Sequence, residues 1–169
     1  MVDLLFETPR LRTRLFTLED AELLCNLNSD PEVIRYVGEK PCDDVESAKK
    51  ILDEIILPQY SLYHMGRLAV ELKETGEFIG WCGIKKLVDS DEYDLGYRFF
   101  RKHWRKGYGG ESAKAALDWG HSVRGLKKII GKADILNLGS VKVLEKIGMK
   151  FERFGTECHG KTAVYSSIQ

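Results

Sequence analysis

The sequence predicts a single α/β domain with a mixed sheet. Its 169 residues, of which 43% are hydrophobic, are enough to bury one compact core. Segments whose apolar residues alternate with a period of two are interleaved with segments of helical spacing. The resulting order is β-α-α-β-β-β-α-β-α-β-β, and no linker, repeat or low-complexity stretch divides the chain. We therefore expect one domain over residues 1–169.

The first third of the chain is predicted to hold one strand followed by helices. Residues 10–15 alternate strictly, which is typical of a half-buried strand. Residues 17–20 have the form of a capped helix start, and Pro31 favours the first turn of a second, short helix. A longer helix begins near Asp44, where apolar residues recur at helical spacing, and Pro58 is expected to end it.

The middle of the chain is predicted to be mostly strands. Two strands, over residues 68–72 and 78–84, flank the turn of residues 73–76 and form a hairpin. A third strand over residues 93–100 leads through a glycine-rich turn into a helix over residues 111–124.

The last third of the chain continues the alternation. A strand over residues 129–135 is followed by a helix that either Asn137 or Ser140 can cap and that Gly148 closes. The two final strands lie near residues 151–154 and 163–168.

Composition excludes several classes of protein. Lysine plus arginine equals aspartate plus glutamate at 26 each, which argues against a generally basic nucleic-acid binder. No apolar run approaches the ~20 residues of a membrane span, and the first residues do not form a signal peptide. The scattered cysteines contain no C-x-x-C pair and are expected to be reduced thiols of a cytoplasmic protein. They are Cys25, Cys42, Cys82 and Cys158.

The glycine-rich turn Trp104–Glu111 is the feature that carries most chemical information. A strand-to-helix turn of this kind exposes backbone N–H groups without helical partners, and the helix dipole adds about half a positive charge there. Five basic residues and no acid precede the helix: Arg98, Arg101, Lys102, Arg105 and Lys106. The turn is therefore predicted to bind an anion such as a pyrophosphate.

Other phosphate and nucleic-acid motifs fit the turn poorly. No Walker sequence is present, and Ser112 stands where the dinucleotide motif requires its third glycine. The residues Lys106–Gly109 match the first four positions of an RNA-binding RNP1 strand. Gly110, Glu111 and Ala113 then occupy positions where that strand needs apolar or aromatic residues. An RNA-binding module is thus an unfavoured alternative.

Several blocks of the chain resemble the GNAT superfamily of N-acyltransferases. Gly96-Tyr97 and Trp104–Glu111 resemble its acyl-CoA motif, and the segment from Asn137 to Met149 resembles its second block. The segments Thr8–Arg14 and Asp30–Val33 are similar to the branch that contains ribosomal-protein N-terminal acetyltransferases. The resemblance implies a mostly antiparallel mixed sheet with a central parallel pair of strands that splay apart, flanked by helices.

The resemblance also implies acetyl-CoA as co-substrate. It would bind in the gap where the two parallel strands separate, called the splay below, with its pyrophosphate on the turn. The implied contacts are Tyr97, Phe99, Arg105, Lys106, Gly107, Tyr108, Gly109, Gly110, Asn137 and Ser140. Three positions depart from the family pattern. Trp104 replaces the usual Gln or Arg, Arg105 replaces the usual Gly, and Leu144 stands where many members carry a tyrosine general acid.

The chemistry that the resemblance implies is attack of a neutral amine on a thioester. Presenting an α-amine neutral at pH 7 costs about 1.4 kcal/mol, and a lysine amine about 4.6 kcal/mol, so a dedicated base is optional for the former. The family pattern implies Asp94 as the base and Ser140 near the leaving sulfur. Glu92 is a reserve candidate for the base, and Asp134 ranks after it. Tyr36, Trp81 and Tyr93 are candidates for lining the acceptor pocket.

We therefore expect an acetyl-CoA-dependent N-acetyltransferase that works by direct transfer in a ternary complex. The acceptor is a protein N-terminus or a small amine, and Cys82 and Cys158 are not expected to carry the acetyl group. A catalytically silent domain that senses coenzyme A is the alternative. We expect no metal, membrane or nucleic-acid partner, and the sequence leaves monomer and homodimer open.

Overall fold

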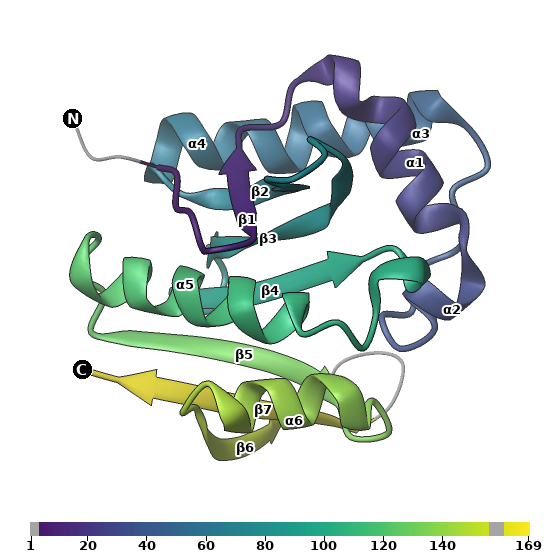
Figure 1. Cartoon of the computed structure of the whole chain (residues 1–169). Coiled ribbons are helices and arrows are strands. Elements are labelled where there is room, and N and C mark those ends of the chain that lie inside the picture. Colours follow the sequence, from purple (N-terminus) through teal and green to yellow (C-terminus); the bar gives the residue numbers. More distant parts are fainter. Residues whose placement is uncertain (1–3, 156–160) are drawn as a thin grey trace.

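The computed structural model describes residues 4–155 and 161–169 and shows a twisted sheet with helices on both faces (Figure 1). The strand order is β1-β2-β3-β4-β5-β7-β6. The strands are β1 (Leu11–Arg14), β2 (Gly66–Leu72), β3 (Phe78–Leu87), β4 (Glu92–Phe99), β5 (Lys128–Asp134), β6 (Lys150–Gly155) and β7 (Thr162–Ile168). The helices are η1 (Leu18–Asp20), α1 (Ala21–Ser29), α2 (Pro31–Ile34), α3 (Val45–Ile51), η2 (Leu52–Ile56), α4 (Leu57–Tyr63), η3 (Arg101–His103), α5 (Tyr108–Ser122) and α6 (Leu138–Lys146).

The parallel pair β4–β5 divides the sheet, and all the other strand pairs are antiparallel. Its register contains only two pairs, Asp94 with Ile130 and Leu95 with Gly131. Both strands then continue, β4 to Phe99 and β5 to Asp134, without pairing with each other. The predicted splayed pair is therefore confirmed, and the strands separate immediately after Leu95.

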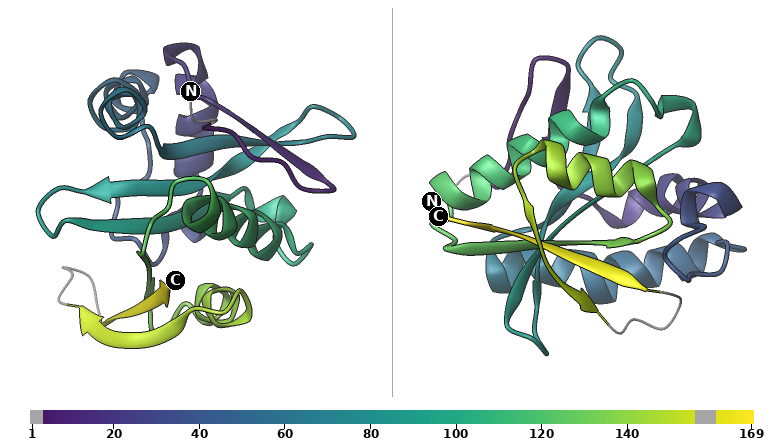
Figure 2. Two further views of the ribbon diagram at one scale, coloured as in Figure 1. Left: turned by 90° about the vertical axis from the view of Figure 1, so that its left-hand side faces the viewer. Right: turned by 90° about the horizontal axis from the view of Figure 1, so that it is seen from below.

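Helices cover both faces of the sheet (Figure 2), and each face carries a hydrophobic core. One core packs α5 and α6 against the sheet and includes Leu95 and Phe99 of β4. The other packs α1, α3 and α4 against β2 and β3, with Trp81 at its margin. Because successive side chains of a strand point to opposite faces, Asp94 lies on the face opposite to Leu95.

Acidic and amide side chains cap several helices near the predicted starts. The Asp44 carboxylate accepts a hydrogen bond from the Ser47 N–H at 2.8 Å, and Asp30 accepts one from Glu32. At α6 the two candidate caps are resolved, because the Asn137 Oδ1 accepts from the Ser140 N–H at 3.2 Å. Asn137 is thus the cap of α6.

The expectation that Pro58 ends the longer helix is wrong. The helix that begins at Val45 passes through the π-helical turn Leu52–Ile56 and continues as α4 to Tyr63. A proline inside a regular helix lacks the N–H of the ladder and clashes with the carbonyl four residues earlier. The wider π turn breaks that regular ladder, so Pro58 lies in the first turn of α4, where prolines are tolerated.

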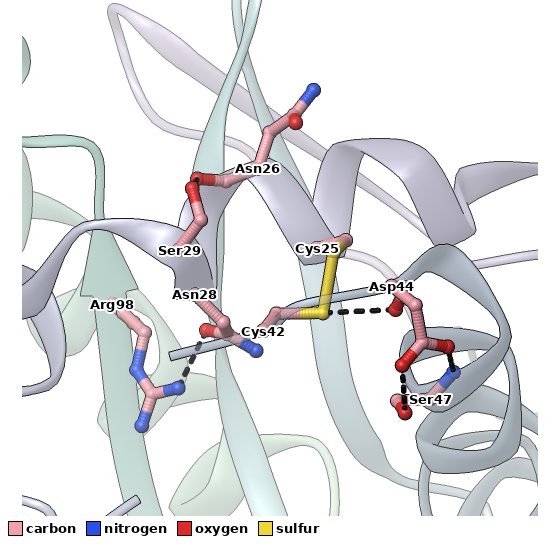
Figure 3. The surroundings of a disulfide bond; sticks show 8 residues. All are labelled: Cys25, Asn26, Asn28, Ser29, Cys42, Asp44, Ser47 and Arg98. Atoms are coloured by element: carbon pink, nitrogen blue, oxygen red, sulfur yellow. Dashed lines mark hydrogen bonds between the residues drawn. A yellow bond between two sulfur atoms is a disulfide. The ribbon is translucent and has the colours of Figure 1, made fainter. Parts of the chain in front are cut away.

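The expectation of four reduced cysteines is also wrong for one pair. Cys25 of α1 and Cys42 of the segment after α2 form a disulfide, with their Cα atoms 5.3 Å apart (Figure 3). The Cys42 N–H donates to the Asn28 carbonyl at 3.0 Å, and this contact brings the segment back onto α1. Cys82 is a free, buried thiol whose pKa is raised to about 12 by burial. Cys158 lies outside the described residues.

Within the described segments, no helix combines the length and the apolar character that crossing a bilayer requires.

We predict that reducing the Cys25–Cys42 disulfide lowers the free energy of unfolding by about 3 kcal/mol, because the bond closes a loop of 17 residues in the unfolded chain. Urea unfolding with and without dithiothreitol measures the difference. The variant with both Cys25→Ser and Cys42→Ser is the control, and dithiothreitol should leave its unfolding midpoint unchanged. Equal midpoints for the oxidised and reduced wild-type protein would contradict the assignment.

Candidate active site

The turn that joins η3 to α5 takes its shape from the backbone. Arg105 and Gly107 adopt left-handed conformations, with φ of +61° and +83°. The family resemblance implies glycine at this position, and glycine would reach positive φ without the steric cost that Arg105 carries. The Trp104 Nε1–H donates to the Phe99 carbonyl at 2.8 Å and anchors the entry of the turn on β4.

The first turn of α5 presents its backbone openly. The helix begins at Tyr108, three residues before the predicted start, and no side chain caps its N-terminus. A Cβ atom on Gly110 would meet nothing within 4 Å, and one on Gly109 would lie 3.2 Å from the Tyr97 ring. Unpartnered N–H groups, a helix dipole and missing side chains together suit a pyrophosphate.

The basic run beside the turn is less free than its sequence suggests. Three of its five members form ion pairs with nearby acids: Arg98 with Glu39, Arg101 with Asp30, and Lys102 with Glu77. Arg105 and Lys106 are exposed and form no ion pair within the described part of the chain. These two side chains are therefore the ones available to an anion on the turn.

Arg10 and Thr8 also reach the turn, and sequence reasoning missed both. The Glu111 carboxylate accepts hydrogen bonds from the Thr8 hydroxyl at 2.6 Å and from the Arg10 Nε–H at 2.7 Å. Arg10 also donates to the Lys106 carbonyl at 2.9 Å. Thr8 and Arg10 stand in the family-like opening segment, but no sequence rule pairs residues about a hundred positions apart.

Tyr97 and Ser140 meet on the α5–α6 side of the splay. The Tyr97 hydroxyl donates to the Ser140 Oγ at 3.4 Å, and burial raises the pKa of Tyr97. Phe99 stacks near Tyr97, with 6.0 Å between the ring centroids. Leu144 is buried, and a Cβ on Gly131 would lie 2.7 Å from it. The position at which the family resemblance implies a tyrosine acid is therefore part of the core in this chain.

Asp94 lies on the opposite face of β4 in a nearly buried ion pair. The Arg67 Nη2–H donates to the Asp94 Oδ2 at 2.5 Å, and Nη1 donates to the backbone carbonyls of Asp94 and Gly83 at 2.7 and 2.5 Å. Both side chains are 11% exposed. No described residue bonds to the Asp94 Oδ1, so this oxygen is open to another donor. Arg67, a further residue that sequence reasoning missed, holds the carboxylate in place.

The other acidic candidates are occupied by structural contacts. Both Glu92 oxygens accept from the Arg153 Nη2, at 2.8 and 3.0 Å. The Asp134 Oδ1 accepts from the Leu136 N–H at 2.8 Å and shapes the turn after β5. Within the described residues, both Glu92 oxygens and one Asp134 oxygen are thus occupied, whereas the Asp94 Oδ1 accepts no hydrogen bond.

The three aromatic candidates for the acceptor pocket are not brought together. Trp81 lies between two guanidinium groups, with its ring centroid 5.0 Å from the Cζ of Arg67 and 5.4 Å from that of Arg98. Tyr36 stands in the segment that follows α2, and Glu39 ties this segment to Arg98.

Tyr93, in contrast, packs against the α5–α6 core beneath the Lys86 ammonium, which lies 4.2 Å from its ring centroid. It lines a surface cavity with Arg124 and Lys127 near the first residue of β4. The structure thus separates Tyr93 from Trp81.

Comparison with known proteins identifies the family. Residues 10–150 match the model of the acetyltransferase (GNAT) domain. The chain is 33% identical over 147 residues to the uncharacterized N-acetyltransferase p20 of Bacillus licheniformis. The aligned residues cover 86% of this chain and 82% of that protein. The acetyltransferase structure from Agrobacterium tumefaciens superposes with a TM-score of 0.84 at 26% identity, over 98% of this chain and 94% of the other.

A Rim-type enzyme shares the fold at lower identity. RimL, a ribosomal L7/L12 alpha-N-protein acetyltransferase solved in complex with coenzyme A, superposes with a TM-score of 0.84 at 12% identity over 97% of each chain. The chain belongs to the GNAT family of acetyltransferases.

Proposed function

We propose that the protein transfers an acetyl group from acetyl-CoA to a primary amine by direct attack in a ternary complex. One observation carries this proposal. The glycine-rich turn before α5 and the Tyr97–Ser140 pair lie on one face of the splayed strands, whereas the Asp94 carboxylate lies on the other. Donor and acceptor can therefore approach the splay from opposite faces. We further propose that residues 1–169 act as one domain.

The donor side would hold acetyl-CoA mainly through the backbone. The N–H groups from Arg105 to Gly110 would bind the pyrophosphate, and the Arg105 and Lys106 side chains would add positive charge. Asn137 uses its Oδ1 as the helix cap, which leaves its Nδ2–H donors for the pantetheine arm. When bound, acetyl-CoA supplies an acetyl group activated as a thioester.

The acceptor side would position and deprotonate the amine. As the amine nitrogen bonds to the acetyl carbon, the carbon–sulfur bond breaks and the sulfur leaves with its electron pair. We propose that the Asp94 Oδ1 accepts the amine proton, directly or through water, while Arg67 fixes the carboxylate. Ser140, bonded to Tyr97, would stand by the leaving sulfur. Placement of the reactants would supply most of the rate.

The acceptor class follows from the strength of the base that the site offers. Arg67 holds the Asp94 Oδ2, so Oδ1 is the oxygen left to accept a proton. A single base of this kind suits an α-amine, for which deprotonation at pH 7 costs only about 1.4 kcal/mol. Two structural neighbours are named for acetylating ribosomal proteins at an N-terminal or alanine site. We therefore propose a protein N-terminus or a small primary amine as the acceptor.

The experiment that tests the function is a mass-detected panel of peptides, polyamines, amino acids and aminoglycosides incubated with acetyl-CoA, combined with calorimetric titration of acetyl-CoA. We expect binding and a mass increase of one acetyl group on at least one amine. Binding without turnover across the panel would favour a sensor of coenzyme A. No binding at millimolar acetyl-CoA would exclude both the enzyme and the sensor.

We predict that Gly109→Val weakens acetyl-CoA binding at least about tenfold, a loss of roughly 1.4 kcal/mol. The added Cβ lies 3.2 Å from the Tyr97 ring, so the branched side chain fills the space between α5 and the donor side of the splay. Isothermal titration measures the affinity. Lys114→Val, on the exposed face of the same helix, is the matched control and should bind like wild type. Unchanged affinity in Gly109→Val would remove the turn from the donor site.

We predict that Asp94→Asn lowers kcat/KM mainly below pH ~8, the pKa of an α-amine, where the acceptor is protonated and needs a base. Asparagine can still accept the hydrogen bond from Arg67, so the thermal unfolding midpoint should report any loss of structure separately. The measurement is a pH profile of kcat/KM. Glu92→Gln, whose wild-type carboxylate bonds Arg153, should retain the wild-type profile. If the pH profile of kcat/KM for Asp94→Asn runs parallel to that of wild type, Asp94 is not the base.

A further inference from the structure

Arg10 connects the entry of β1 to the turn that precedes α5. Its Nη1–H donates to the Lys106 carbonyl, its Nε–H and Nη2–H reach the Glu111 carboxylate, and its guanidinium lies 4.5 Å from the centroid of the Tyr108 ring. One side chain therefore contacts three residues of the turn and of the first helical turn. Of these three residues, Tyr108 also packs against the α5–α6 core.

The bond to the Lys106 carbonyl determines where the turn points its next N–H group. In a trans peptide the C=O and the following N–H point in opposite directions. Because the Lys106 carbonyl faces Arg10, the Gly107 N–H is directed away from Arg10. Lys106 lies between two residues with positive φ angles, Arg105 and Gly107. Arg10 thus holds the orientation of one of the N–H groups on the turn.

The contact with Glu111 removes an electrostatic conflict. A carboxylate in the first turn of α5 would repel a pyrophosphate bound at the same helix end. Burial alone would raise the pKa of Glu111, but hydrogen bonds from Thr8 and Arg10 outweigh it and hold the pKa below its usual value. The carboxylate therefore stays charged, and Arg10 both neutralises it and turns it toward β1.

We propose that Arg10 is a positioning residue for the donor. It orients the Lys106–Gly107 peptide and screens the Glu111 charge, so that the affinity for a pyrophosphate-bearing acyl donor depends on the docking of β1 on α5. The inference rests on the proposed function, since it assumes that the turn binds the pyrophosphate of acetyl-CoA. It assigns Arg10 no contact with the acetyl group or the amine.

The experiment compares two acetyl donors with Arg10→Ala. Acetyl-CoA carries the pyrophosphate, and S-acetyl-pantetheine carries the same thioester arm without it. We expect the KM and Kd for acetyl-CoA to rise about tenfold, the effect of losing one charge-assisted contact, with kcat within about twofold of wild type. The kinetic constants for S-acetyl-pantetheine should not change. Arg10→Lys should recover part of the affinity.

Two further variants separate positioning from general structure. Arg12→Ala removes a neighbouring arginine of β1 that pairs with Glu71 and does not touch the turn, so its donor constants should equal those of wild type. The double variant Arg10→Ala, Glu111→Gln also lacks the negative charge of Glu111. It should therefore bind acetyl-CoA more tightly than Arg10→Ala alone.

The outcomes distinguish the two proposals. A wild-type protein that neither binds nor uses acetyl-CoA would refute the proposed function itself. If the wild-type protein binds acetyl-CoA, the role of Arg10 can be judged from the Arg10→Ala variant. Unchanged constants, or equal impairment with both donors, would overturn that role. A selective loss with acetyl-CoA supports it.

Discussion

The structure depends on the shortness of the parallel contact between β4 and β5. Two residue pairs join these strands before they separate. In the sheet, each strand otherwise pairs only with its antiparallel neighbour. The two halves of the sheet thus have one narrow seam between them. Because side chains alternate along β4, Tyr97 and Asp94 reach opposite faces at this seam. A donor and an acceptor that approach from the two faces would meet there.

Charge at the site is arranged by distant segments. The basic run before α5 is largely neutralised by Asp30, Glu39 and Glu77, which come from the first half of the chain. Arg10, also from the first half, compensates Glu111. On the other face Arg67 of β2 holds Asp94 of β4. Loss of either partner of a buried ion pair strongly destabilises the folded protein, because the remaining charge has no partner. The N-terminal half of the chain thus sets the electrostatics of a turn that lies in the second half.

The expectations that failed share a cause. Pro58 was predicted to stop a helix because local rules treat a proline by its nearest neighbours, yet a π turn absorbs its clash while the helix packs on β2 and β3. The Cys25–Cys42 bond has no local signature either, since it forms only when the segment after α2 folds back on α1. Tyr93 was grouped with Trp81 by residue type, whereas strand alternation puts it in the other core.

The sequence by itself determined the fold and the family and located the glycine-rich turn proposed to bind pyrophosphate, because periodicity, caps and the glycine motif act over a few residues. It also predicted that Arg105 was unusual, and the structure supplies the reason in its positive φ. Only the tertiary structure decided which charges remain free at the turn, that Arg67 holds Asp94, and that Arg10 reaches Lys106 and Glu111. These contacts join residues far apart in the chain, and their geometry exists only once the sheet has formed.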